Sequence, residues 1–511
     1  MLIVSEEEFM NAANIDWIIA GIFMVFLAIG GYACRFFIKS AADWTVAGRN
    51  MRKFLGLSTA RAEGMGLVSL ALATEIGFTS GFSYVGLSII AITVVPILYG
   101  GTGFVINRYR EAKVVTVPEY AQRRYSKGVR IVTAGILTFA GILNLAIFPI
   151  IASQFLTYFL NTQPHVDVMG LHLPFVPLIM AGLIGLALLF AYAGGMVSVV
   201  LTGYIQSVMM AIAIFIITWL VIRQVGFDGI HKTIDSNFGE GGYNPFVSDY
   251  FGPVFLIWIV LQVILGFPSF APQMQKLAST DNAKTARQMT MIQSLFASGG
   301  SLMIVVWGVA ALAVLGPVAS GGIDSGLYPK VVGAIYLGQL IPPVLFGFVL
   351  AGMLGAFISV VDSYLLTWST VLVNDVISPL VRKPLTPKNH LWLLRICVAV
   401  IAILIYLFGI VYQPTETLLE FIILTGTMML GSGILLIGGL YWKRASKAGA
   451  YAAVIFCAII PIVNLILKRT AENGEVFRAQ DFGLGAIILA VLFFVLFSVL
   501  FPDKKNKCYS V

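Results

Sequence analysis

Charged residues are scarce in this sequence of 511 residues: they make up 11% of it, whereas 59% of the residues are hydrophobic. A soluble globular chain carries about 25% charged residues. Because ions are costly in hydrocarbon, a deficit of this size excludes a soluble globular protein and places most of the chain in a membrane. The net charge of +8 could suggest a nucleic-acid partner, but the basic residues lie in short loops between apolar runs, which indicates membrane orientation instead.

Residues that mark other classes of protein are also few. The four cysteines show neither metal-ligand spacing nor a disulfide framework, and the four histidines form no paired cluster, which disfavours a membrane enzyme. The N-terminus has no basic start of the kind that precedes a cleaved signal peptide. No N-x-Ser/Thr sequon occurs, which disfavours a eukaryotic secretory protein. The sequence contains no pore-lining repeat or filter sequence of the kind that would indicate a channel.

Long apolar runs are present instead, and they recur along the whole chain. They are continuous, without the period-two alternation of barrel strands, so they predict transmembrane helices. We expect an all-α polytopic protein with about thirteen spans, and a short extra helix between Pro329 and Pro343 before the ninth. The expected spans begin near Asp16, Ala62, Phe82, Gly128, Leu171, Val197, Phe251, Ala286, Pro342, Leu391, Thr415, Ala448 and Phe482.

The basic residues of the loops predict an orientation. Loops assigned to the cytoplasm hold 24 of the 32 Lys and Arg residues, and loops assigned to the outside hold six. A bias of this size is a strong topology signal. With an odd number of spans, the N-terminus is expected outside and the C-terminus in the cytoplasm.

Three acidic residues fall inside apolar segments: Glu75, Asp362 and Glu420. Intramembrane acids are costly and usually line a pathway or an ion site, although each can also be a buried acid paired only for packing. For Glu420, a position near the outer end of its helix favours the packing interpretation.

The residues around Glu75 suggest an interrupted helix. The stretch 72–81 combines small residues, hydroxyls and glycines in the middle of a span. A glycine-rich interruption at membrane depth frees backbone carbonyls, and such discontinuous helices form ion and substrate sites in transporters. A small-residue face for helix packing is the alternative.

A second polar cluster surrounds Asp362. Helical spacing places Ala356, Ser359, Asp362 and Ser363 on one face. Two hydroxyls and a carboxylate supply hard oxygen ligands that suit a small cation. Serine often bonds to its own helix in membranes, so the cluster carries the prediction rather than Ser359 alone.

Four motifs, in order along the chain, resemble the sodium/solute symporter family. They are Trp44 to Arg49 (W-T-V-A-G-R), Thr116 to Tyr125 (T-V-P-E-Y followed by R-R-Y), Ser359 to Asp375 (S-V-V-D-S continuing to D), and Gly438 to Ala450 (G-G-L-Y-W-K-R followed by G-A). Together they cover most of the chain.

The resemblance implies a LeuT-like core, in which the second to eleventh helices form two inverted five-helix repeats, and sodium-driven uptake of a small organic solute by alternating access. It divides the single transporter domain into an extra N-terminal helix and loop (1–60), the repeat core (about 61–470), and a C-terminal helix with a short tail (about 471–511). It also implies a sodium site with backbone carbonyls from Ala73, Ile76 and Ala356 and the hydroxyl of Ser359.

The chain departs from the family pattern at two positions. Val360 stands where a second hydroxyl is usual, and Gly203 stands where Asp is common and serves an additional sodium in some members. We hypothesise that the carboxylate has moved to Asp362, beside Ser363. Glu75 would compensate at the first site, or carry a proton instead, because burial in hydrocarbon favours the protonated carboxyl group.

The solute is expected near the midplane between the repeats. The residues predicted to line its site are Glu75, Phe78, Thr79, Gln154, Trp258 and Gln262, each of which could also serve packing. A sugar, an amino acid or a carboxylate fits the family. A proton-coupled or uncoupled transporter and a membrane sensor remain as alternatives. We expect a multi-pass protein of the plasma membrane, the inner membrane of a bacterium, bound to lipid and to no nucleic acid.

Overall fold

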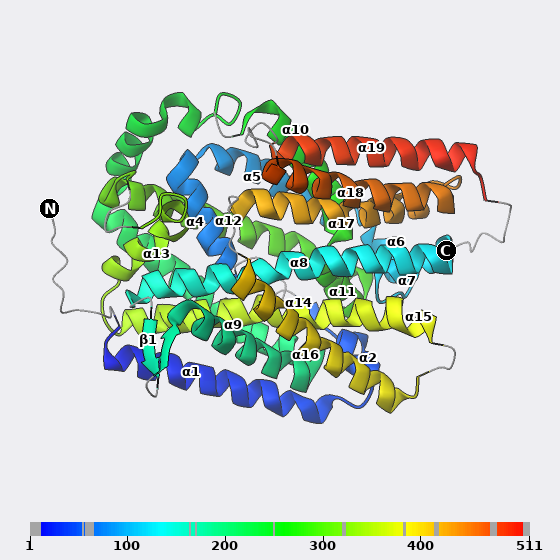
Figure 1. The fold of residues 1–511 in the computed structure, drawn as a ribbon, viewed down its shortest axis with the longest axis horizontal. Coiled ribbons are helices and arrows are strands. Elements are labelled where there is room, and N and C mark those ends of the chain that lie inside the picture. Colours follow the sequence, from blue (N-terminus) through cyan, green and yellow to red (C-terminus); the bar gives the residue numbers. More distant parts are fainter. Residues whose placement is uncertain are drawn as a thin grey trace.

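The computed structural model describes residues 12–53, 56, 66–162, 165–168, 171–248, 251–318, 323–381, 385–412, 418–470 and 478–503. Within these residues the chain is almost entirely helical, and most of its long helices run along the same axis (Figure 1). The one sheet in the described part is a hairpin in which β1 (His165–Val168) pairs antiparallel with β2 (Leu171–Pro174). The prediction of an all-α fold is therefore confirmed apart from this hairpin.

The helices follow one another with short connections. In chain order they are α1 (Asn14–Ala33), η1 (Cys34–Phe37), α2 (Ala41–Val46), η2 (Ala47–Arg49), α4 (Leu67–Ser80), α5 (Ser83–Val94), η3 (Val95–Gly101), α6 (Ile106–Glu111), α7 (Val117–Arg124), α8 (Lys127–Leu160), α9 (Phe175–Phe238), η4 (Gly239–Gly242), α10 (Gly252–Ser269), α11 (Ala271–Ser279), α12 (Ala283–Leu315), α13 (Tyr328–Leu340), α14 (Leu345–Val371), η5 (Leu372–Ile377), α15 (Ser378–Leu380), α16 (Pro387–Val411), α17 (Leu418–Tyr441), α18 (Lys447–Thr470) and α19 (Ala479–Leu500).

Ten of the helices in the described residues are long and apolar enough to cross a membrane, so the count of thirteen is not confirmed. The difference arises where spans are short or joined. At 64 residues, α9 would be about 95 Å long, more than one crossing of a ~30 Å hydrocarbon layer. It breaks at Gly195 (φ 49°, ψ −143°), between the expected fifth and sixth spans. The short extra helix expected before the ninth span is α13.

Position 195 requires glycine, because of its backbone conformation and because of the atoms around it. Its positive φ favours glycine, and a Cβ built on it would lie 2.6 Å from the backbone oxygen of Trp44. Trp44, from the first family-like motif, is fully buried against this break. The motif thus fixes where α2 packs on α9.

Two further helices begin or end inside the bundle. α4 starts at Gly66, whose backbone is extended, and α10 ends at Phe270 (φ −78°, ψ 97°), immediately before α11. Pro268 and Pro272 flank this second break, and proline removes the backbone donors that a continuous helix would need. The chain therefore has an interrupted helix at Phe270 that the hydropathy pattern did not predict.

The interruption predicted within 72–81 is wrong, because α4 is helical throughout Leu67–Ser80. Its small residues serve a helix crossing instead. A Cβ on Gly77 would lie 2.2 Å from the carbonyl oxygen of Val305, and one on Gly308 would lie 2.1 Å from that of Thr74. Glycines at these positions let α4 and α12 approach backbone to backbone.

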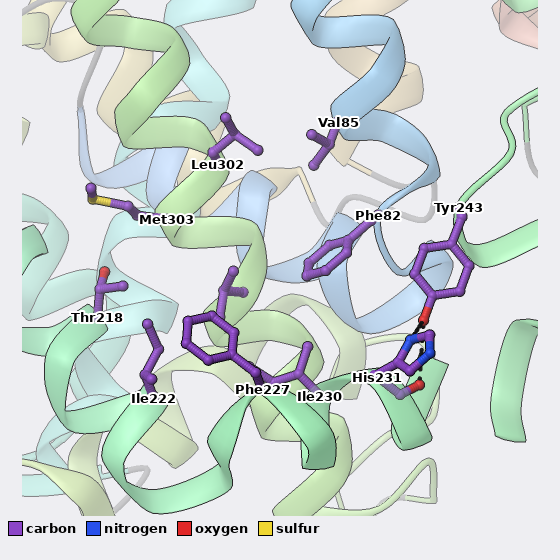
Figure 2. A pocket seen from close by; sticks show the side chains of 11 residues that line it. Phe82, Val85, Thr218, Ile222, Phe227, Ile230, His231, Tyr243, Leu302 and Met303 are labelled. Atoms are coloured by element: carbon purple, nitrogen blue, oxygen red, sulfur yellow. Dashed lines mark hydrogen bonds between the residues drawn. The ribbon is translucent and has the colours of Figure 1, made fainter. Parts of the chain in front are cut away.

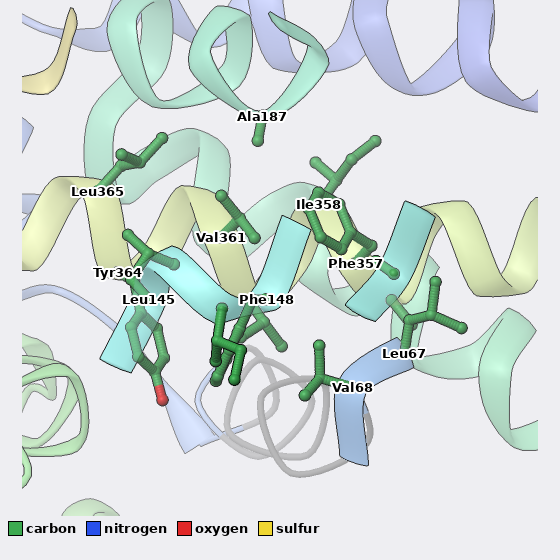
Figure 3. Packing of buried hydrophobic residues seen from close by; sticks show 14 of the residues in the cluster. Leu67, Val68, Leu145, Phe148, Ala187, Phe357, Ile358, Val361, Tyr364 and Leu365 are labelled. Atoms are coloured by element: carbon green, nitrogen blue, oxygen red, sulfur yellow. The ribbon is translucent and has the colours of Figure 1, made fainter. Parts of the chain in front are cut away.

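The interior is formed by α4, α8, α9 and α14, and the start of α4 lies beside the middle of α14 (Figure 3). Leu67 and Val68 belong to the same buried cluster as Phe357 and Ile358. Large apolar side chains on the outer helices are exposed instead, for example Ile22 at 66% and Leu492 at 55%. An apolar exterior of this kind suits contact with lipid.

Candidate functional site

A cavity of about 530 Å³ lies between the start of α4 and the break between α10 and α11. Ser69 and Leu72 reach it from the first turns of α4, and Phe270 reaches it from the break between α10 and α11. Side chains of η3, α8, α12, α14 and α17 complete its wall. Its volume falls in the range usual for small-molecule sites.

The cavity lies near the middle of the bundle. Asn144, one of its lining residues, stands halfway along α8, whose 34 residues span about 51 Å. Substrate sites of transporters with interrupted helices occupy the same depth, near the bilayer midplane.

Carboxamides supply four of the eight polar side chains that line the cavity. The Asn144 amide nitrogen donates to the Thr425 hydroxyl at 2.7 Å, which joins α8 to α17. The Gln273 amide nitrogen donates to the Gln293 amide oxygen at 3.1 Å, which joins α11 to α12. Gln262 of α10 packs against Gly426 of α17, where a Cβ would lie 3.3 Å from its amide nitrogen.

Of the residues predicted to bind solute, only Gln262 lines this cavity. Phe78 makes an edge contact with the ring of Tyr328, and the Thr79 hydroxyl donates to the Glu75 carbonyl oxygen at 2.9 Å. The two others also lie apart from the cavity: Trp258 is buried beside Gly483 of α19, and Gln154 is half-buried on α8.

The sequence analysis missed Asn144, Gln273, Gln293 and Thr425. The signal that could have located them was the pair of prolines within an apolar span, Pro268 and Pro272, since discontinuous helices usually form the site.

Glu75 is buried on α4, one turn beyond Leu72, and does not line the cavity. The backbone N–H of Leu418, at the start of α17, is a hydrogen-bond partner of its carboxylate, and the charge of Lys330 on α13 acts on it. Its Oε2 has no hydrogen-bond partner among the residues that the structure describes. Glu75 therefore lies where α4, α13 and α17 meet.

The polar face of α14 lies deep in the bundle, and Ser359, Asp362 and Ser363 are all at most 1% exposed. The hydroxyls of both serines have no hydrogen-bond partner within the described part of the chain. A buried polar group left in this condition costs about 1–3 kcal/mol. The arrangement can hold a ligand that coordinates oxygen.

α9 packs along this face in the opposite direction. A Cβ on Gly352 would lie 3.6 Å from that of Ala213, and one on Gly355 would lie 3.1 Å from the Gln206 side chain. Continuing this register, Ser359 comes opposite the turn of α9 that contains Gly203, and Asp362 comes about one turn further, near Val199.

The structure does not bring Ala73 and Ile76 to this face. The part of α4 that approaches this face is its N-terminal end at Gly66, where a Cβ would lie 2.7 Å from the Val360 side chain and 3.9 Å from the Ala356 carbonyl oxygen. Ala73 and Ile76 stand about 10 and 15 Å further along α4, inside a continuous helix whose bonds occupy their carbonyls. Residues 57–65, which precede Gly66, lie outside the described residues.

Glu420 has a different partner. Its carboxylate accepts a hydrogen bond from the Lys468 ammonium group at 2.7 Å, which joins α17 to α18. This ion pair supports the packing interpretation of Glu420.

A second cavity, of about 470 Å³, lies between α5, α9 and α12 (Figure 2). Its polar side chains bond to one another or to protein: His231 with Tyr243, and Thr218 with Trp307 and the Ile214 carbonyl. Because the rest of its wall is apolar, this cavity lacks converging groups for a solute. Among the described residues, no group of three His, Cys, Asp or Glu side chains could hold a metal ion.

Comparison with known proteins identifies the family. Residues 44–457 match the Sodium:solute symporter family. The osmoregulated proline transporter OpuE of Bacillus subtilis is 25% identical over 56% of each chain. The sodium/glucose cotransporter of Vibrio parahaemolyticus is 23% identical over 84% of this chain and 80% of its own. A sodium/proline symporter of Staphylococcus aureus is 22% identical over 94% and 93%.

Solved structures show the same fold. A Na+-coupled sialic acid symporter, in a substrate-bound outward-open state with a novel Na+ site, superposes with a TM-score of 0.80 at 18% identity, over 97% of this chain and all of that one. MhsT in complex with L-phenylalanine gives a TM-score of 0.51 at 15% identity, over 87% and 98%. With its apolar helices and the match of most of its length, this chain is a multi-pass membrane protein that belongs to the sodium:solute symporter family, and it is a sodium-using transporter rather than an enzyme.

Proposed function

We propose that this protein takes up a small organic solute together with sodium by alternating access, and that the solute binds in the cavity between the start of α4 and the break at Phe270. The observation that carries the proposal is the position of the cavity, between the start of α4 at Gly66 and the break at Phe270. Interrupted helices leave backbone groups open at midplane, where rocking of one half of the fold exposes the site to either side.

The sodium site in this proposal lies on α14, at Ser359, Asp362 and Ser363 with the Ala356 carbonyl. The hydroxyl oxygens of Ser359 and Ser363, which have no hydrogen-bond partner among the described residues, and a buried carboxylate are the kind of ligands that a hard cation prefers. The register of α9 places Ser359 opposite the turn of Gly203 and Asp362 about one turn further along α14, so a carboxylate at Asp362 would lie near, but not at, the position that Gly203 leaves without one. Val360 brings no ligand oxygen, and a contribution of Ala73 and Ile76 would require α4 to shift.

A proton-coupled mechanism is the second candidate, and Glu75 is the observation that favours it. A buried carboxyl group with one oxygen lacking a hydrogen-bond partner in the described residues can exchange a proton when α4, α13 and α17 move apart. Glu75→Gln removes this exchange and keeps the size of the side chain. Uptake is measured without sodium under an inward proton gradient. Uptake by the wild type that is lost in Glu75→Gln would support proton coupling over sodium coupling.

The orientation remains part of the proposal: the N-terminus outside and the C-terminus in the cytoplasm of a bacterium. α1 begins at one end of the bundle and α19 ends at the other (Figure 1). Helices α6 and α7 lie at the same end of the bundle as the end of α19 (Figure 1), and the last turn of each carries two arginines. The preference for basic residues on the inside supports a cytoplasmic position for this end. Within this arrangement, 1–60 and about 471–511 flank a repeat core of about 61–470.

Radiolabelled uptake into liposomes tests the proposal. The purified protein is reconstituted and offered a panel of small solutes that includes L-proline, D-glucose and N-acetylneuraminate, with and without an inward sodium gradient. Accumulation of at least one solute that requires the gradient is expected. Accumulation that is equal in potassium and in sodium would contradict sodium coupling.

A further inference from the structure

The wall of the central cavity carries no formal charge. Among the described residues that line it there is no Asp, Glu, Lys, Arg or His. Its polar side chains are carboxamides, hydroxyls and the phenol of Tyr364. A solute with a net charge would therefore leave water without a side chain of opposite charge to receive it, which is unfavourable in a site of low dielectric.

The carboxamides present both hydrogen-bond donors and acceptors. Asn144 and Gln273 each use the amide nitrogen in the bonds to Thr425 and Gln293, so the acceptor oxygen is the other end of each amide. Gln293 uses its oxygen, so its other end is a donor. Groups that both donate and accept, such as hydroxyls, match such a mixed wall, whereas a carboxylate can only accept.

Aromatic rings form another part of the wall. The Tyr364 ring lies 5.4 Å from that of Phe148 and 5.5 Å from that of Phe270, measured between centroids. All three residues line the cavity. Their surfaces suit the C–H face of a saturated ring, with the polar edge of the ring directed to the carboxamides.

The sodium ion of the proposed site does not supply the missing charge. Asp362 belongs to the α14 face that packs on α9, whereas Tyr364, two residues further on, reaches the cavity from another side of the helix. The carboxylate of Asp362 therefore neutralises the ion on its own side of α14. A solute carboxylate in the cavity would gain little from that ion.

We propose that the transported solute is an uncharged ring compound bearing several hydroxyl groups, of the sugar or cyclic polyol class, bound by Gln262, Gln273 and Gln293 and by the aromatic rings. The inference rests on the proposed function, since it takes the central cavity as the solute site. It excludes organic anions and organic cations as preferred solutes. It also excludes amino acids, because the carboxylate and the ammonium group of a zwitterion would each lack a side chain of opposite charge in this wall.

Ligand-induced thermal stabilisation of the full-length purified protein tests the class. D-Glucose, myo-inositol, L-proline, N-acetylneuraminate and choline are compared in sodium buffer. We expect saturable stabilisation by at least one of the two polyols and none by the other three. Failure of a wider series of neutral hexoses and cyclitols to stabilise the protein overturns the class, whatever the charged solutes do.

Two variants locate the site. Gln262→Leu and Gln293→Leu remove the hydrogen-bonding ends and leave an apolar side chain one atom shorter, so each should weaken polyol binding by roughly three- to tenfold. Gln154→Leu, half-buried on α8 away from the cavity, is the matched control and should bind as the wild type does. Equal affinity in all three variants contradicts the assignment of the cavity.

Failure of the inference differs from failure of the proposed function. Sodium-dependent accumulation of L-proline without any polyol would overturn the solute class and leave sodium-coupled uptake standing. Polyol binding and uptake that do not depend on sodium would support the proposed solute class and contradict sodium-coupled uptake.

Discussion

The carboxylate of Asp16, in α1, caps the start of α14 at Val344: its Oδ1 accepts the Val344 backbone N–H at 2.7 Å and also that of Gly347 at 2.8 Å. Asp16 is fully buried, although α1 lies at the edge of the bundle. A Cβ on Gly347 would lie 2.6 Å from the Cα of Asp16, so the two helices are in close contact there. The helix outside the expected repeat core thus fixes the helix that carries the polar face.

Replacing this cap should destabilise the protein. Asp16→Ala leaves the first N–H groups of α14 without an acceptor and should cost about 1–2 kcal/mol. Asp16→Asn keeps an acceptor oxygen and should cost less. Thermal unfolding of the purified variants in detergent measures the order, and an alanine variant as stable as the wild type would show that the cap contributes nothing.

A methyl group at Gly308 should disturb the crossing of α4 and α12. Gly308→Ala places its Cβ 2.1 Å from the Thr74 carbonyl oxygen, and overpacking of this kind costs about 1–3 kcal/mol. Gly299→Ala, on the same helix, is the matched control, since its Cβ would meet nothing within 4 Å. Folded yield and melting temperature should fall for the first variant only. Equal behaviour of the two would contradict the backbone-to-backbone contact.

Arg110 should stabilise the C-terminal end of α11. Its guanidinium group donates to the carbonyl oxygens of Ala278 and Thr280, both at 2.6 Å, at the end of a helix whose nine residues are all buried. Cations at a helix C-terminus are favourable, and here the cation also satisfies open carbonyls.

Hydrogen exchange measured by mass spectrometry should show the loss of this contact. Arg110→Ala should speed exchange over 271–279, because the end of α11 loses its cap. Arg123→Ala is the control: Arg123 is more exposed and bonds only to Glu119 and Ala112 among the described residues. Unchanged exchange in the Arg110 variant would mean that packing alone holds α11.

The sequence predicted the helices well, because a bilayer sets the length and composition of each span. The starts of α8, α10 and α19 lie within three residues of the positions expected from hydropathy. Hydropathy could not detect the break at Phe270, since proline and phenylalanine keep the run apolar while they end the helix.

The site was harder to predict because its residues come from distant parts of the chain. Asn144 and Thr425 are 281 residues apart in sequence, and no local pattern pairs them. Glu75 drew the prediction towards α4, since an acid within a span usually marks a site. In the structure, the Glu75 carboxylate instead interacts with the backbone N–H of Leu418 and with the charge of Lys330. These partners belong to α17 and α13, so they can be identified only once the packing of those helices is known.

The sodium dependence of uptake, measured for the wild type and for Asp362→Asn, tests the central claim most directly. The solute that accumulates in liposomes is titrated with sodium at two pH values, and Gln154→Leu is the control. The account predicts saturable sodium dependence at both pH values for the wild type and the control, and at least a tenfold higher sodium requirement for Asp362→Asn, because the buried ion loses its counter-charge. Uptake that does not respond to sodium in the wild type, or an unchanged sodium requirement in the variant, would contradict it.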